Sequence, residues 1–178
     1  MKPELKISKL DAARRQLETV VRLYFSSGDP VSIHTLTSAA YNILKDINKK
    51  RGGTPLLLKE QFISFVKPEY QKLVKEKLNE AENFFKHADR DHDAVINFNP
   101  EQSEFLTYEA CTTYTTLTGE VPPMIKIYKV WYVSHHTDLY EFTEDVKKEI
   151  SKLLPSVLSM NKEEYFNTIL PVAFSYRI

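Results

Sequence analysis

Apolar residues recur every three to four positions along most of this 178-residue chain, and glycine or proline interrupts the pattern only at short breaks. The chain has only four glycines, which are too few and too scattered for a phosphate-binding loop of the dinucleotide-binding or P-loop type, because both loops need several glycines at fixed spacing. The four that occur lie where apolar stripes end: Gly28, Gly52, Gly53 and Gly119. The pattern predicts an all-α bundle of about six to eight helices.

The chain begins with two predicted helices that form a hairpin. Ser8, with Asp11 three residues later, opens the first helix as an acidic variant of a capping box. Asp29 and Pro30 suit the N-cap and the first turn of the second helix. Basic residues at 49–51 end this helix before two glycines, where cations are favoured by the helix dipole.

A longer helix is expected from about residue 69 to residue 87, after a short apolar segment. Tyr70 and Leu73 belong to its apolar stripe, so we expect both side chains to be buried. Asn99 followed by Pro100 then predicts the start of the next helix, with asparagine as the cap and proline in the first turn.

The segment 107–134 is compatible with two structures. Residues 112–116 and 125–133 are rich in β-branched and aromatic side chains and could pair as a β-hairpin. We expect two helices instead, because the Asn-Pro start above is specific and Pro122-Pro123 also suits a helix start. An isolated two-stranded hairpin would also be only marginally stable.

Two further helices complete the expected fold. Thr143 is placed to cap the first, and Asn161 with Glu164 forms a capping box for the second. The stripe of the first consists of Val146, Ile150 and Leu153. Because the sequence has no internal repeat and no long linker, we expect residues 1–178 to form a single helical domain.

Composition limits the class of partner and the compartment. The chain has 24 basic and 24 acidic residues, so its zero net charge gives no support to nucleic-acid binding, although a local patch stays open. Cys111 is the only cysteine, which excludes an intramolecular disulfide. The N-terminal residues are too polar for a signal peptide, and no apolar run approaches the roughly 20 residues of a membrane span. We therefore expect a cytoplasmic protein that does not bind membranes.

An acidic segment follows the predicted helix at 69–87. Asp89, Asp91 and Asp93 alternate along it, as the first ligands of an EF-hand calcium loop do. The sixth loop position, which needs glycine for a sharp turn, is Ala94, and the twelfth, which needs a bidentate glutamate, is Pro100. The segment therefore predicts a degenerate calcium site or a solvated acidic loop.

The same region offers ligands for a transition metal. His87, Asp91 and His92 combine imidazole and carboxylate groups that suit zinc, manganese or iron, and Asp89 and Asp93 add further oxygens. A divalent metal is the one cofactor that the sequence suggests, although nothing in the spacing fixes the ligand geometry.

Other reactive side chains give weaker signals. His34 lies among apolar residues of the second helix, so we expect a core histidine bonded to a neighbouring helix, or one that meets His87 across the bundle. Cys111 lies inside a predicted helix, and nothing marks it as an activated thiolate. Adjacent His135 and His136 would point in different directions.

Three blocks of the sequence resemble a family of uncharacterised bacterial proteins of similar length. The blocks cover residues 10–18, 31–36 and 83–89 and occur in the same order in that family. The resemblance implies a bacterial helical domain and implies no activity.

The segment Glu82-Asn83-Phe84-Phe85-Lys86-His87 is similar to the signature of HEPN (higher eukaryotes and prokaryotes nucleotide-binding) domains. That resemblance implies a helical bundle with a composite ribonuclease site, usually at a dimer interface. Asn83 and His87 match the signature, whereas Glu82 stands where the family has arginine. A carboxylate there would repel the phosphoryl charge that the arginine stabilises.

These observations favour a helical binding domain that acts as a homodimer, because no catalytic motif is complete. Aromatic side chains, dense between Tyr108 and Phe142, could form a dimer interface or a pocket for an unidentified small molecule. The alternatives are a HEPN-like nuclease or metal-dependent hydrolase, with His34, Asn83 and His87 as catalytic candidates, and a calcium-binding module.

Overall fold

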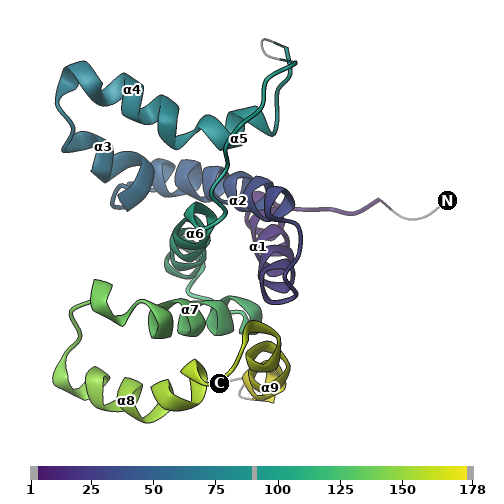
Figure 1. Ribbon diagram of the computed structural model, residues 1–178, viewed down its shortest axis with the longest axis vertical. Helices are drawn as coiled ribbons and strands as arrows, with labels where there is room; N and C mark the ends of the chain where they lie inside the picture. The colour runs from purple at the N-terminus through teal and green to yellow at the C-terminus, as the bar shows by residue number, and fades with distance from the viewer. Residues whose placement is uncertain (1–3, 90–91, 176–178) are drawn as a thin grey trace.

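The computed structural model describes residues 4–89 and 92–175, and within them the chain is all-α (Figure 1). No helix of the described part is both long and apolar enough to cross a bilayer. In chain order the elements are α1 (Lys9–Phe25), α2 (Pro30–Lys50), η1 (Leu57–Gln61), α3 (Phe62–Ser64), α4 (Pro68–Leu78), α5 (Glu80–Phe84), α6 (Gln102–Thr118), α7 (Pro123–His135), η2 (Thr137–Leu139), α8 (Glu144–Leu158) and α9 (Lys162–Ser175).

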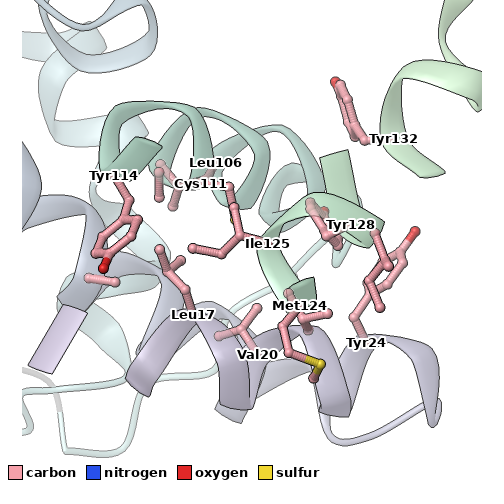
Figure 2. Packing of buried hydrophobic residues seen from close by; sticks show 14 of the residues in the cluster. Leu17, Val20, Tyr24, Leu106, Cys111, Tyr114, Met124, Ile125, Tyr128 and Tyr132 are labelled. Atoms are coloured by element: carbon pink, nitrogen blue, oxygen red, sulfur yellow. The ribbon is translucent and has the colours of Figure 1, made fainter. Parts of the chain in front are cut away.

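The hydrophobic core lies among α1, α2, α6 and α7: α1 packs against the other three helices, and α6 also packs against α2 and α7. Figure 2 shows side chains of α1, such as Leu17, facing Ile125 of α7 and Leu106 of α6. α9 closes the α7 side, since the buried Tyr165 hydroxyl donates to the Ile127 carbonyl over 3.0 Å. The aromatic excess thus serves largely as core.

A polar seam joins α2 to α6 within this core. His34 Nδ1 lies 3.0 Å from the Ser103 hydroxyl, and the Thr37 and Thr107 hydroxyls are also 3.0 Å apart. All four side chains are buried, so each of these bonds satisfies groups that have lost water. The expectation that His34 bonds a neighbouring helix is confirmed.

Several helix starts follow the predicted caps. The Ser8 hydroxyl accepts from the Asp11 backbone N–H, and the Asp29 carboxylate accepts from that of Ser32. Asn161 and Glu164 form a reciprocal capping box, each side chain accepting a backbone N–H of the other residue at 3.0 Å. The segment 107–134 is helical on both sides of a turn, which confirms the choice against a β-hairpin.

Three local predictions need correction. The helix expected at 69–87 is divided at Asn79, and Tyr70 and Leu73 are exposed rather than buried. The helix predicted at Asn99 begins at Gln102, because the Asn99 side chain accepts from the Glu101 N–H in a preceding turn.

The helix predicted after Thr143 is only partly described. Thr143 precedes α8 as expected, but its side chain makes no capping hydrogen bond. The stripe of that helix, Val146, Ile150 and Leu153, lies outside the side chains that the structure describes.

Residues 57–78, comprising η1, α3 and α4, form an arm that extends from the core (Figure 1, upper left). Its start is fixed to α6, where the buried Glu109 carboxylate accepts the backbone N–H groups of Leu57 and Leu58. The core does not cover α4, since this helix contacts only α3 and α5 extensively and has no fully buried residue among those described.

Candidate functional site

A groove of about 720 Å³ lies beside the C-terminal half of α4, where this helix meets α5. Three sequence-predicted residues, Asn83, His87 and Asp89, line it together. Its other walls come from α4, α5 and the segment 94–96: Leu73, Glu76, Lys77, Glu80, Phe84, Ala94, Val95 and Ile96. Asn83 and His87 of the HEPN-like segment thus share one surface with Asp89 of the acidic segment.

The break at Asn79 sets the direction of the groove wall. The Asn79 side-chain amide donates to the Lys75 carbonyl and its oxygen accepts from Lys59 Nζ, each at 2.7 Å. A side chain that bonds its own preceding turn competes with helix continuation, so α4 ends there. Past the break, Asn83 and His87, four residues apart, are both exposed on the groove side.

Glu82 points the opposite way and is buried. Its carboxylate accepts from Lys59 Nζ at 2.6 Å and from Lys86 Nζ at 2.7 Å. Burial alone would raise the pKa of Glu82, but the bonds from the two lysines outweigh it and lower the pKa to about 2. At the position where the HEPN signature has arginine, this chain therefore holds an inward carboxylate that its own lysines neutralise.

His34 belongs to the packing behind the groove. Its ring meets Phe85 and Phe98 edge to face, with centroids 5.8 and 5.2 Å away. Burial, reinforced by the positive charge of Lys59, lowers the pKa of His34 to about 4. The predicted meeting with His87 is not among the contacts in the described residues; aromatic rings contact His34 instead.

The predicted metal ligands do not converge in the part of the chain that is described. No group of three His, Cys, Asp or Glu side chains in residues 4–89 and 92–175 is arranged to hold an ion. Asp91 lies outside the described residues. His92 and Asp93 are exposed and pair with each other at 3.0 Å. The donors of the described residues form no such group, and the calcium and transition-metal interpretations stay predictions.

The remaining reactive groups are held in structural contacts. Burial raises the pKa of the Cys111 thiol to about 12, so it carries no thiolate near neutral pH. His135 Nδ1 lies 2.9 Å from the Trp131 carbonyl, whereas His136 Nε2 lies 3.9 Å from Glu104. The two adjacent histidines thus point to different partners, as expected.

Among the side chains that the structure describes, the arm carries a concentration of exposed apolar groups that the sequence analysis missed. Phe65 is 84% exposed, and the other members are half-exposed: Leu57, Phe62, Tyr70 and Leu73. Apolar patches of this kind on folded proteins commonly mark interaction surfaces. Helical spacing predicted that Tyr70 and Leu73 are buried. Spacing alone does not show whether an apolar face is buried in the chain's own core or by another molecule.

Sequence reasoning also missed a second, smaller pocket. It has a volume of about 310 Å³ between the α1–α2 turn, the start of α6 and Lys162. The Tyr24 hydroxyl donates to Glu104 at 3.0 Å, and the Lys162 ammonium lies 3.7 Å from the centre of the Tyr24 ring. These residues come from three distant helices, and nothing in the sequence pairs them.

Comparison with protein-family models, curated proteins and solved structures gives no match to this chain. The functional conclusion therefore depends on the site itself.

Proposed function

We propose that this protein is a helical binding domain that contacts a macromolecular partner through the arm. The observation that carries the proposal is the concentration of exposed apolar side chains there. Three large aromatic side chains, Phe62, Phe65 and Tyr70, stand half or more in solvent within nine residues. A short arm gains no stability from exposing them. A partner that covered them would remove apolar surface from water, which stabilises the complex by roughly 25 cal/mol per Å².

The arm is also held in a way that suits binding. Glu109 anchors its start to α6, and Lys59 ties η1 to Glu82 of α5 and to Asn79. The surface is therefore presented on supported helices, so a partner meets little of the ordering cost that a flexible segment imposes.

Site-specific photocrosslinking in cells tests this proposal. A benzophenone amino acid at position 65 or 73 should give adducts of defined mass, whether with this chain or with another protein. The same amino acid at Val172, an exposed apolar position on α9, is the matched control. No adduct at 65 and 73, or the same adducts at 172, would contradict the proposal.

A nuclease or hydrolase is the second candidate, and the shared groove position of Asn83, His87 and Asp89 favours it. The groove's charges do not suit a polyanion, because Glu76 and Glu80 add to Asp89 while Lys77 is the one lysine or arginine among the lining residues. Nucleic-acid binding has no other support in the described residues.

The His87→Ala variant tests this second candidate. General acid–base catalysis by a histidine contributes about 10²- to 10⁴-fold, so removal of the imidazole should reduce cleavage of RNA or of a nucleotide by that factor. His92→Ala is the control, since His92 is exposed outside the groove lining. An unchanged rate in His87→Ala would reject catalysis through this residue.

A further inference from the structure

One side of α4 carries a short stripe with an acid at one end and a base at the other. Glu69, Leu73 and Lys77 are spaced by four residues, so they lie on one face, and Tyr70 lies beside them. All four are exposed. The side of α4 that is partly covered is a different one, formed by Gln71, Val74 and Leu78.

This stripe is complementary to itself in one orientation only. If two copies of α4 pack antiparallel about Leu73, Glu69 of each copy faces Lys77 of the other, and the apolar residues meet in the middle. A parallel arrangement would set Glu69 against Glu69 and Lys77 against Lys77. Lys77 pairs with Glu80 in its own chain at 2.7 Å, but both side chains are more than half exposed, so Lys77 stays accessible to a second carboxylate.

The amount of apolar surface also fits a second copy. A fully buried aromatic side chain removes about 150–250 Å² from water, so the exposed fractions of Phe62, Phe65 and Tyr70 correspond to roughly 300–450 Å² per copy, to which Leu57 and Leu73 add. Two copies with their polar margins would then approach the lower bound of about 1,200 Å² for stable interfaces. A two-fold contact needs one surface that serves both partners, and the stripe provides it.

We propose that a second copy of this chain covers the arm, with the two α4 helices antiparallel and centred on Leu73. The proposal rests on the arm being a binding surface, and it names the partner. Leu73 and Lys77 also line the groove, so the dimer contact runs along its edge. In that register the segment before α4 lies next to the segment that follows α4 in the second copy, which is α5.

Charge reversal tests the pairing directly. Glu69→Lys alone and Lys77→Glu alone each set like charges opposite each other twice in a homodimer, so each variant should dissociate at least about tenfold more readily. In a mixture of the two variants, every facing pair is again one acid and one base. Sedimentation velocity should therefore show a dimeric wild type, two weakened single variants and a one-to-one heterodimer in the mixture.

Lys75→Glu is the matched control, because Lys75 is exposed on α4 and lies about 160° around the helix from Leu73, the centre of the stripe. It should leave the dimer intact, and circular dichroism should show the same helix content in all variants. A monomeric wild type at about 100 μM, or single variants that dimerise like wild type, would overturn the antiparallel pairing. Crosslinks from positions 65 and 73 to another protein would then still support the arm as a binding surface.

Discussion

A buried glutamate at position 82 shows how one residue can decide between two interpretations of a motif. A buried carboxylate is costly unless it is paired and hydrogen-bonded. Here Asn42 also donates to the Glu82 carboxylate, in addition to the two lysines. The carboxylate is therefore part of the support between α2, η1 and α5, a role that differs from that of the signature arginine.

His34 gives a residue-scale prediction about pH. Its pKa is about 4 in the folded protein and about 6.5 in an unfolded chain, so the unfolded state takes up the proton first as the pH falls. The stabilisation is complete above pH 6.5, decreases from 6.5 to 4 and is constant below that. When the pH falls from 7 to 4.5, the free energy of unfolding measured with urea should decrease by about 2–3 kcal/mol more for wild type than for His34→Gln.

Glutamine is the informative replacement, because its amide can still bond Ser103 but does not titrate in this range. Other groups, Glu82 among them, titrate in both proteins and cancel in the comparison. Equal pH dependence in the two proteins would show that His34 is solvated or already charged in the fold.

The sequence predicted the environment of His34 better than that of Glu82. An imidazole within an apolar helical stripe indicates a core position, and the structure places it there. The partner of Glu82 could not be predicted, since Lys59 lies 23 positions away and looks like an ordinary solvent-exposed lysine after a short apolar run.

At the scale of elements, caps were predictable and interruptions were not. Ser8, Asp29 and Asn161 bond backbone groups within three residues, so the local sequence contains the whole interaction. The break at Asn79 depends on Lys59 as well as on the local Lys75 carbonyl. A long helix was therefore the simplest local prediction, and a tertiary contact divided it.

The attachment of the arm gives an element-scale prediction. Glu109→Ala would leave the Leu57 and Leu58 N–H groups without their acceptor, and each hydrogen bond that is lost costs about 0.5–1.5 kcal/mol. Hydrogen exchange across residues 57–66 should accelerate by about tenfold or more, because 1.4 kcal/mol corresponds to a factor of ten. Exchange in α1 should change little.

Glu141→Ala provides the comparison, since Glu141 is exposed in the connection after η2. It should leave exchange in the arm unchanged. If Glu109→Ala gave the same arm protection as wild type, η1 would be held by Lys59 and its own turn rather than by α6.

For the whole molecule, helical periodicity was enough to predict an all-α fold but not which stripes the chain itself covers. The stripes of α1 and α7 face one another and form the core, and that of α4 faces outward (Figure 2 shows the first case). A stripe at helical spacing is the same pattern in both cases. Whether an apolar stripe is buried depends on long-range packing within the chain, or on a second molecule.

If a second copy covers the arm, the Tm must depend on protein concentration. Two folded chains form one dimer, so a higher concentration favours the folded, dimeric state over the unfolded chains. A hundredfold rise in concentration should raise the Tm of wild type by about 3–5 °C for a chain of this size. Glu69→Lys should reduce that dependence, whereas Lys75→Glu should keep it, as calorimetry at two concentrations can measure. A wild-type Tm that stays constant over that range would mean that the arm contributes no self-association to the stability of the folded state.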